Sequence, residues 1–525
     1  MLDVLVQNGT VVDGSGAPGY RADVAIDGDR IAEVGVLEGA RAETVIDASG
    51  CVVTPGFVDM HSHTDFTLPI NPTADSLVHQ GITTAVMGQC GASPAPLLED
   101  TRQQVIATLE REDAPMPWDK WSTFGSYLEH LTQIGTSINV APLVGQGMVR
   151  MAVMGFVADP PSEEQMTRMQ NEVIQALEGG AIGVSTGLIY APGCYASTEE
   201  LIAFTQPAGE RNGFYFSHIR GESETLLVAI AEAIRIGRET GAAVQISHFK
   251  AARRANWSKA AQALELIDQA RAEGLDVTAD MYPYPASSTG LSSLLPNWAH
   301  EGGREATLKR LADAETRFKM VSDRQPGGTL RTTEWDRILI SGCPKNRDYE
   351  GHTVADLAAE ANKPPHDWVF DALLETEMGI SMIAFTMSEE NRELAMHHPA
   401  MMIGTDGSGL ATEGPLSTGL PHPRSYGTFP RVLAHYVREQ GVISLEEAIR
   451  KMSGLPAQKL RWTDRGLVRK GYRADLVVLD PDTVADLATY EAPHQYPTGI
   501  PHVIVNGKLV VHNSAHTRAR PGSVL

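Results

Sequence analysis

The sequence of 525 residues has little cysteine, no long apolar run and no excess of basic residues. Its four cysteines are widely spaced, which argues against a disulfide framework and fits a reducing cytoplasm. No uninterrupted apolar run could cross a bilayer, and the N-terminal residues lack the basic start and apolar core of a secretory signal. A net charge of −22 argues against nucleic acid and anionic membranes as main partners. We therefore expect a cytoplasmic protein.

The two ends of the chain share short runs of alternating apolar residues around Asn-Gly and Asp-Gly. DVLVQNGTVVD and DVAIDGDRIAEVG lie in the first fifty residues, and RADLVVLD and HVIVNGKLVV lie near the C-terminus. Alternation of this kind is typical of half-buried strands, and the two dipeptides favour hairpin turns. We predict one small β-sandwich domain built from residues 1–54 and 466–525.

The middle of the chain alternates short apolar strands with amphipathic helices, such as SEEQMTRMQNEVIQALEGG and ESETLLVAIAEAIRIGRETG. This alternation predicts a parallel α/β barrel or a doubly wound sheet, and over residues 55–465 we favour a TIM-like (β/α)8 barrel. The strand candidates number one more than a barrel needs, and SMIAFTM is taken as the extra piece. Residues 286–349, which contain SSTG, RQPGGT and SGCPKNRDYEG, are too long for a plain connection and predict an inserted lid subdomain.

Polar residues follow several of the predicted strands. His61 and His63 alternate in PGFVDMHSHTD, so both side chains project from one face at the end of an apolar run. The same placement recurs at Cys90 in VMGQCG, His218 in GFYFSHIR, His248 in VQISHFK and Asp406 in MMIGTDGSG. Each residue alone reads more simply as a surface or hydrogen-bonded core residue. Together, at the catalytic end of parallel strands, they predict a divalent transition-metal site.

With these residues the chain resembles the amidohydrolase superfamily. GQCGASPAP, GVSTGLIYAPG, SHFK, DMYPY and HPRSYGTFPR make it similar to the D-aminoacylase branch, the N-acyl-D-amino-acid deacylases. The resemblance covers nearly the whole chain, with one small departure at Gln89, where the branch pattern has Asn before the cysteine. It implies the same barrel, split β-domain and insertion that the patterns predict.

The resemblance also implies a metal arrangement. Cys90, His218 and His248 would hold a tightly bound zinc ion, and His61 and His63 would flank a second, weaker position beside Cys90. Thiolate is a ligand that zinc favours. Other amidohydrolases bridge two metals with a modified lysine on the fourth strand, but AIGVSTGLIY contains no lysine. The chain therefore departs from the hydantoinase and dihydroorotase pattern.

Amide hydrolysis needs a polarised carbonyl and a proton carrier. Zinc would supply the first, and Asp406 could accept the proton of the attacking water and deliver it to the leaving nitrogen. The alternative for Asp406 is a turn-stabilising residue in TDGSG. Tyr190 could donate a hydrogen bond to the developing oxyanion, and its alternative is a packed aromatic residue.

The resemblance implies that Lys250, Tyr282 and Arg424 bind the α-carboxylate of the substrate, and Ser287 is a further substrate-binding candidate. No Lys or Arg lies between Tyr282 and Arg304. That absence favours neutral or apolar substrate side chains, contacted through a set of apolar residues in the insertion: Leu291, Leu294, Leu295 and Trp298. The alternative is that these four residues pack the lid onto the barrel.

We predict zinc-dependent hydrolysis of N-acyl-D-amino acids to a carboxylate and a free D-amino acid. The preference for D over L comes only from the resemblance. The alternatives are a cyclic-amide hydrolase, a non-catalytic scaffold on the same fold and a metal-storage protein. A small molecule is the expected partner, and the oligomeric state is open.

Overall fold

Eight parallel strands form the centre of the computed structural model, which describes residues 1–110, 114–324 and 329–525. Their order in the sheet follows the chain: β6 (Phe57–Asp59), β7 (Ile82–Met87), β8 (Asn139–Gly145), β9 (Gly183–Gly187), β10 (Phe214–His218), β11 (Ala243–Ile246), β12 (Val277–Met281) and β16 (Met401–Ile403). Every residue of these strands is buried, as expected for a parallel sheet covered on both faces.

The first and last strands of this sheet meet beyond their carboxyl ends. The backbone N–H of Asp406 donates to the His61 carbonyl at 2.7 Å, and that of His63 donates to the Gly407 carbonyl at 2.7 Å. The sheet therefore curves into the near-closed α/β barrel expected from the sequence. SMIAFTM lies outside it, also as expected.

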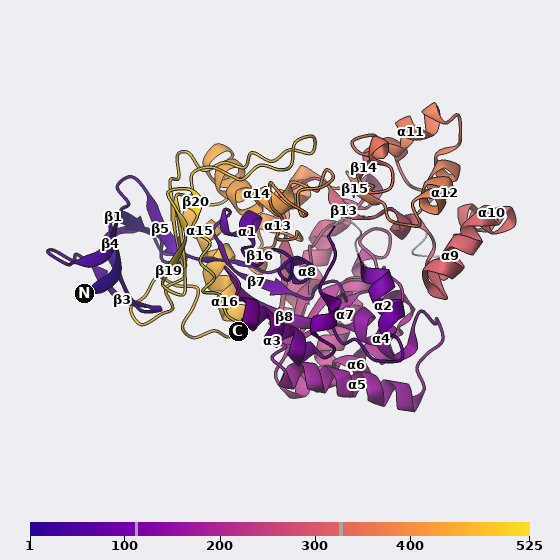
Figure 1. Cartoon of the computed structure of the whole chain (residues 1–525), viewed down its shortest axis with the longest axis horizontal. Coiled ribbons are helices and arrows are strands. Elements are labelled where there is room, and N and C mark those ends of the chain that lie inside the picture. Colours follow the sequence, from indigo (N-terminus) through magenta and orange to yellow (C-terminus); the bar gives the residue numbers. More distant parts are fainter. Residues whose placement is uncertain (111–113, 325–328) are drawn as a thin grey trace.

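Helices surround the barrel strands (Figure 1). They are α1 (Asp75–Val78), α2 (Arg102–Leu109), α3 (Phe124–Ile134), α4 (Gln146–Met154), α5 (Glu163–Glu178), α6 (Thr198–Glu210), α7 (Leu226–Thr240), α8 (Lys259–Ala272), α13 (Glu389–His397), α14 (Arg424–Arg431), α15 (Leu445–Ile449) and α16 (Leu455–Lys459). The N-cap Ser162 forms a capping box with Gln165 at the start of α5. Helix α7 is capped at its C-terminus by Gly241 in the left-handed conformation, the last residue of the expected helical segment ESETLLVAIAEAIRIGRETG.

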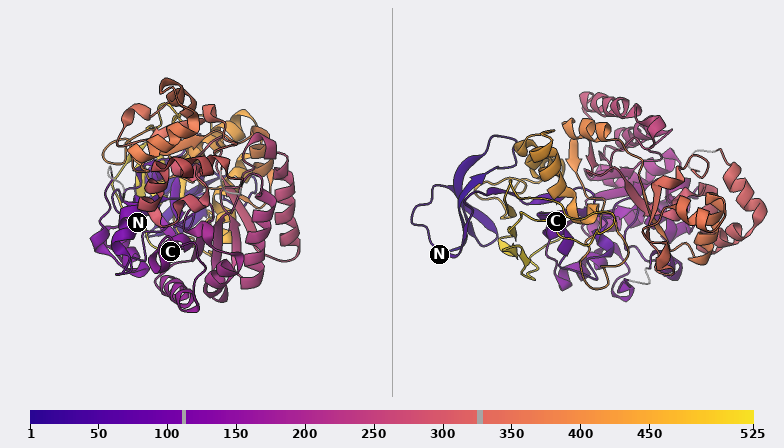
Figure 2. Two further views of the ribbon diagram at one scale, coloured as in Figure 1. Left: turned by 90° about the vertical axis from the view of Figure 1, so that its right-hand side faces the viewer. Right: turned by 90° about the horizontal axis from the view of Figure 1, so that it is seen from above.

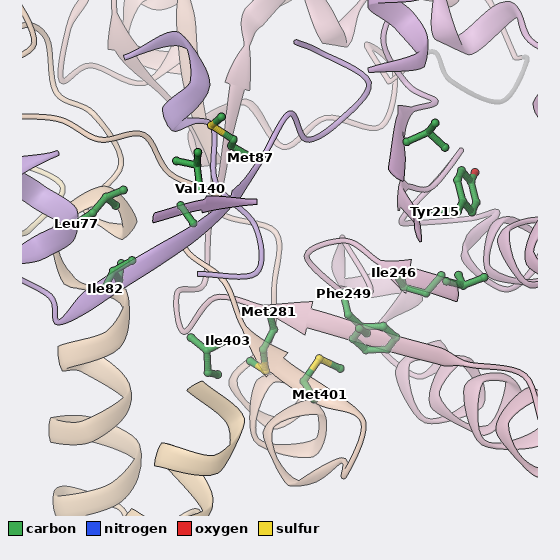
Figure 3. Close-up of a cluster of buried hydrophobic side chains, with 14 of the residues drawn as sticks. Leu77, Ile82, Met87, Val140, Tyr215, Ile246, Phe249, Met281, Met401 and Ile403 are labelled. Atoms are coloured by element: carbon green, nitrogen blue, oxygen red, sulfur yellow. The ribbon is translucent and has the colours of Figure 1, made fainter. Parts of the chain in front are cut away.

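The main hydrophobic core fills the space between these strands and helices. Figure 3 shows part of it, with Ile82, Val140 and Ile246 projecting from three of the strands. All three side chains are fully buried. A close-packed layer of this kind holds the strands rigidly, so the residues at their carboxyl ends are placed precisely.

The two chain ends together build a separate nine-stranded sheet, as the sequence predicts: β1 (Leu2–Val11), β2 (Tyr20–Asp27), β3 (Arg30–Gly35), β4 (Ala42–Asp47), β5 (Val52–Pro55), β17 (Leu476–Leu479), β18 (His502–Val505), β19 (Lys508–His512) and β20 (Ala515–His516). Its halves are joined through β1, which pairs with β2 along most of its length, with β4 near its start and with β5 at its end. The run CVVTPGFVDMH divides at Gly56 between β5 of this sheet and β6 of the barrel. A Cβ at Gly56 would lie 2.1 Å from Thr83 Oγ1, so the two strands meet at a residue that must be glycine.

The insertion has a three-stranded antiparallel sheet and a hydrophobic core of its own. It contains β13 (Ser287–Gly290), α9 (Gly303–Ala312), α10 (Ala314–Ser322), β14 (Ile338–Gly342), α11 (Val354–Glu360), α12 (Pro365–Glu375) and β15 (Ser381–Ala384). Its core continues to Ala384, further than the range 286–349 expected from the sequence, because the SMIAFTM segment returns as the central strand β15. Residues 325–328 of that range lie outside the described residues.

The terminal sheet and the insertion lie at opposite ends of the barrel (Figures 1 and 2). The strand-end residues and the insertion strand β13 border the same cavity. No helix in the described part of the chain has the length and apolar character needed to cross a membrane.

Candidate metal centre and hydrolytic site

The polar residues predicted from strand ends come together at one cavity of about 340 Å³. Five of them line it: His63, Cys90, His218, His248 and Asp406. His61 lies beneath, fully buried, with Nε2 3.3 Å from Cys90 Sγ. The strand-end pattern thus identified a single site formed by segments up to 345 positions apart in sequence, from His61 to Asp406.

Cys90 is the centre of the first group of possible metal ligands. Its Sγ lies 3.5 Å from His218 Nδ1 and 3.5 Å from His248 Nε2. Zinc bonds roughly 2.3 Å to sulfur and 2.0–2.1 Å to nitrogen, at tetrahedral angles, place the two ligand atoms roughly 3.5 Å apart. Burial raises the pKa of the Cys90 thiol well above its usual range, and Asp406 adds to this, so the thiolate needs a cation beside it. Spacing and donor chemistry both fit zinc.

A second group shares Cys90 and faces Asp406. It consists of His61, His63, Cys90 and Asp406, whose ligand atoms all lie within 4.8 Å of one another. Asp406 Oδ1 is 3.2 Å from His63 Nε2 and 3.5 Å from His61 Nε2. The described residues therefore offer two adjoining positions for a cation, with the sulfur common to both.

The backbone is in the left-handed region at three of these residues, with φ of 55° at Cys90, 36° at His248 and 48° at Asp406. Such values are uncommon outside glycine and cost about 1–3 kcal/mol each. They turn each side chain off the strand direction towards the cavity. Gly187 makes room for this turn, because a Cβ there would lie 2.0 Å from the Cys90 carbonyl oxygen.

Two buried carboxyl groups beneath the site fix the strand ends. Asp59 accepts hydrogen bonds from the backbone N–H of Thr405 at 2.7 Å and of His61 at 3.2 Å, which ties the first strand end to the last. Burial raises the pKa of Asp59 to about 7, although its hydrogen bonds oppose this. Asp280 accepts from the backbone N–H of His248 at 2.7 Å, and its Oδ1 lies 3.4 Å from His61 Nδ1.

Asp406 forms a buried ion pair with Arg424, the first residue of α14. Arg424 Nη1 donates to Asp406 Oδ2 at 2.8 Å, and Nη2 donates to the Ser288 carbonyl at 3.3 Å. Burial opposes ionisation of Asp406, but Arg424 and the neighbouring histidines outweigh it and hold the pKa of the carboxyl well below its usual range. Asp406 is thus an ionised carboxylate that belongs to the second ligand group and borders the same cavity as the first.

Lys250 and Tyr282 occupy different places. Lys250 lines the cavity, and its Nζ donates to Glu222 Oε1 at 2.6 Å. Tyr282 is not among the residues that line the cavity; its ring lies 4.9 Å from the Arg424 guanidinium, which packs over its face. The structure therefore brings Lys250 and Arg424 to the cavity and sets Tyr282 behind them.

Tyr190 and Ser287 both line the cavity on the side of the insertion. The Tyr190 hydroxyl shares a hydrogen bond of 3.0 Å with Thr289 Oγ1, and its ring meets that of His218 edge-on with centroids 5.1 Å apart. Ser287 begins β13. Strand β13 thus forms one border of the site, although it belongs to the insertion.

Five apolar residues also line the cavity and form what we call the apolar wall: Leu109, Met148, Met151, Ile189 and Pro192. Sequence reasoning missed this wall and expected four apolar residues of the insertion to contact the substrate side chain instead. Those residues, Leu291, Leu294, Leu295 and Trp298, pack in the insertion's own core and do not line the cavity. Within the insertion, the segment Leu291–Leu294 contacts α12 and the segment Asn297–His300 contacts α9.

Glu222 and Asp280 are two further site residues that the sequence did not single out. Glu222 lies on the loop after β10, four residues beyond His218, and it lines the cavity. Asp280 begins DMYPY, a segment in which only Tyr282 was predicted as a site residue. Only their positions could have indicated a role, because Glu222 follows β10 and Asp280 lies near the end of β12, and both strands end at the site.

The model of the amidohydrolase family matches residues 44–511. The chain belongs to the amidohydrolase family. It is 38% identical to the N-acyl-D-glutamate deacylase of Alcaligenes xylosoxydans xylosoxydans, over all of this chain and 96% of that protein. A solved D-aminoacylase, described as having a binuclear metal centre with one-metal activation and second-metal attenuation, is 36% identical over the full length of both chains with a TM-score of 0.82. A solved N-acyl-D-glutamate deacylase from Bordetella bronchiseptica, complexed with zinc and a phosphonate inhibitor, is 35% identical, covers 100% of this chain and 99% of that chain, and has a TM-score of 0.85.

Within the amidohydrolase family the chain thus falls in the D-aminoacylase group. The similarity extends over the terminal sheet, the barrel and the insertion alike, because the alignments cover this chain completely. These amidohydrolases differ in the amino acid that their names give. Membership of the group therefore leaves the substrate side chain to be argued from the cavity.

Proposed function

We propose that this protein is a zinc-dependent hydrolase of N-acyl-D-amino acids with neutral or hydrophobic side chains, releasing a carboxylate and a free D-amino acid. The observation that carries the proposal is one cavity bordered by the Cys90 ligand group, the Asp406 carboxylate and two cations, Lys250 and Arg424. The D configuration rests on the names of the relatives. A cytoplasmic location belongs to the same proposal, since all four cysteines are free thiols.

Cys90, His218 and His248 would hold a tightly bound zinc ion, and His61 and His63 would flank a second, weaker position. The 3.5 Å spacing around Cys90 Sγ supports the first assignment, and the descriptions of the two solved relatives support both. A zinc ion bound here would supply Lewis-acid polarisation of the amide carbonyl.

Asp406 is the proposed proton carrier. Its Oδ1 would accept a proton from the attacking water, and the same oxygen would deliver it to the leaving nitrogen. The pair with Arg424 keeps the carboxyl ionised before the reaction. The Tyr190 hydroxyl would leave its hydrogen bond with Thr289, which has an ordinary length of 3.0 Å, and donate to the developing oxyanion instead.

The substrate α-carboxylate would lie between Lys250 and Arg424. A planar guanidinium can bind a carboxylate through paired hydrogen bonds, and the Lys250 ammonium adds a further donor. Tyr282 would support this subsite indirectly, by packing its ring against the Arg424 guanidinium. Ser287 at the start of β13 would contribute its hydroxyl from the side of the insertion.

The apolar wall supports a neutral or hydrophobic side chain. Within the described lining of the cavity the only Lys and Arg residues are Lys250 and Arg424, and each is already paired with a carboxylate. An acidic side chain there would be buried without a cation of its own, which is costly. The 38% identity to an N-acyl-D-glutamate deacylase favours the opposite preference, and this second candidate is tested directly below.

A cyclic-amide hydrolase is the other enzymatic alternative. The fourth barrel strand β9 (Gly183–Gly187) carries no lysine that could bridge two metals, which counts against it. A scaffold or a metal-storage protein would not need an ionised carboxylate between the ligands and Arg424.

The test is a substrate panel on purified protein of measured zinc content. N-acetyl-D-leucine and N-acetyl-D-methionine should be hydrolysed, and their L enantiomers and dihydroorotate should not. N-acetyl-D-glutamate should be the poorer substrate by at least tenfold in kcat/KM. Faster hydrolysis of the glutamate compound would replace the side-chain assignment, and turnover of the L series or dihydroorotate alone would replace the function.

A further inference from the structure

Glu222 joins the metal ligands to the substrate cations through a single atom. Its Oε1 accepts from Lys250 Nζ at 2.6 Å and lies 2.9 Å from His248 Nδ1. The side chain is only 17% exposed, and it borders the cavity. One carboxylate oxygen therefore contacts both the Lys250 ammonium and the ring nitrogen of His248.

The Nδ1 atom of His248 has two competing neighbours. Besides Glu222, the Lys250 ammonium lies 2.8 Å from the same nitrogen. An ammonium can only donate, so a bond from Lys250 requires Nδ1 to be an acceptor and places the ring proton on Nε2. A bond to Glu222 requires the opposite, with the proton on Nδ1 and a lone pair on Nε2.

Only the second arrangement suits the metal centre. His248 faces Cys90 Sγ through Nε2, at 3.5 Å, so Nε2 is the nitrogen that must be free to ligate. A histidine that binds a metal through one ring nitrogen commonly donates the N–H of the other to a carboxylate, which fixes both the proton and the ring orientation. The position of Glu222 matches this requirement.

We propose that Glu222 is a positioning residue that keeps the proton of His248 on Nδ1 and at the same time anchors Lys250 beside the cavity. The first half concerns the metal centre and requires no particular substrate. The second half rests on the proposed function, because it assumes that Lys250 binds a substrate carboxylate. Glu222 Oε1 thus fixes the tautomer of His248 and also the position of Lys250 relative to the metal centre.

The neutral variant Glu222→Gln tests the first half. It keeps the size of the side chain but removes the charge, and its amide can donate to Nδ1 and push the ring proton to Nε2. Zinc-loaded full-length protein is mixed with a chromophoric chelator, and the transfer of zinc is followed at equilibrium. We expect 10- to 100-fold weaker zinc retention, the range seen when such carboxylate partners are lost.

Glu224→Gln is the matched control. It removes one carboxylate from the same loop, but the Glu224 side chain is 62% exposed and its nearest cation is Arg253 at 3.8 Å. Its zinc retention should equal that of the unmodified protein. Glu222→Asp, which keeps the charge on a shorter side chain, should retain more zinc than Glu222→Gln and covers the case that the latter fails to fold.

Kinetics test the second half. Glu222→Gln should raise KM for N-acetyl-D-leucine by about tenfold more than for N-acetyl-D-leucinamide, which lacks the carboxylate. Unchanged zinc retention in a folded Glu222→Gln protein overturns the role towards His248, whatever the substrate is. Equal changes in KM for the two compounds would show that Glu222 does not position Lys250. If the unmodified protein loses all its zinc to the chelator immediately, the metal centre itself is not supported.

Discussion

Replacing Asp406 with Asn separates proton transfer from metal binding. The amide has nearly the shape of the carboxyl group but cannot accept the proton of the attacking water. Cys90, His218 and His248 are unchanged, so the first ligand group should still hold one zinc ion per chain. Turnover should be almost abolished while the metal content stays near that of the unmodified protein.

The expected loss is large because one group serves two steps. Positioned acid–base groups contribute about 10²–10⁴-fold to a rate, so kcat should fall towards the upper end of that range. Stability should fall as well, since the Arg424 side chain is only 7% exposed and loses its partner at 2.8 Å. Removing one member of a buried ion pair costs about 3–5 kcal/mol. We expect the lower part of that range, because Arg424 keeps its bond to the Ser288 carbonyl.

The assay measures kcat with N-acetyl-D-methionine, zinc content by atomic emission and the free energy of unfolding in urea. The double variant Asp406→Asn, Arg424→Met removes both charges, so it should recover most of the lost stability and none of the activity. Recovery of that kind would assign the destabilisation to the unpaired guanidinium. A single variant that keeps more than a tenth of the original kcat would refute the proton-carrier role, and one that loses its zinc would show that Asp406 is needed to hold the metal.

Three further changes test other parts of the site and the scaffold. Arg424→Ala should lower kcat/KM for carboxylate-bearing substrates by at least 100-fold, and an unchanged value would remove Arg424 from the substrate subsite. Leu109→Arg places a cation on the apolar wall and should raise the ratio of N-acetyl-D-glutamate to N-acetyl-D-leucine hydrolysis at least tenfold, with Val228→Arg on the exposed surface as its control. Burial lowers the pKa of Lys459 in the folded protein to about 8, although Asp276 opposes this shift. Between about pH 8 and 10.5 this lysine therefore carries a proton in the unfolded chain but not in the folded protein, so the free energy of unfolding increases as the pH rises through that window. Lys459→Met should abolish that gain, seen as a difference of up to about 3 kcal/mol between the pH profiles of urea unfolding; parallel profiles would contradict it.

The residues of the candidate metal centre could be picked out from the sequence because each belongs to a local pattern. His218 and His248 end or follow short apolar runs, and in a parallel barrel all such ends share one rim. The pattern needs no knowledge of which strands are neighbours. The sequence placed the boundary between the two sheets after residue 54, close to Gly56. The need for glycine at that point was not predictable, because the close approach of Thr83 exists only in the folded chain.

Glu222 shows why the rest of the site could not be predicted. It lies in HIRGESE, where the other charged residues are equally good candidates for the site from the sequence alone. Two of these, Arg220 and Glu224, prove to interact with residues outside the site. Arg220 pairs with Glu232 at 3.0 Å, and Glu224 is exposed. Glu222 becomes distinct only where the fold brings Lys250 and His248 from the next strand end to its carboxylate. The apolar wall was missed for a similar reason, since composition cannot distinguish Met148 beside a cavity from Leu291 inside a core.

The charges around the cavity link metal binding to recognition of an anionic substrate. Lys250 and Arg424 are each compensated by a protein carboxylate, Glu222 and Asp406, so these four groups carry no net charge together. Lys250 and Arg424 alone would attract a substrate carboxylate only weakly, because each cation already pairs with a carboxylate of the protein. A zinc ion held by the Cys90 thiolate would add one net positive charge next to the same space, which would favour binding of an anion. The argument predicts that affinity for a carboxylate-bearing inhibitor, such as an N-acyl-D-amino acid phosphonate, falls when zinc is removed by more than affinity for its amide, and equal losses for the two compounds would contradict it.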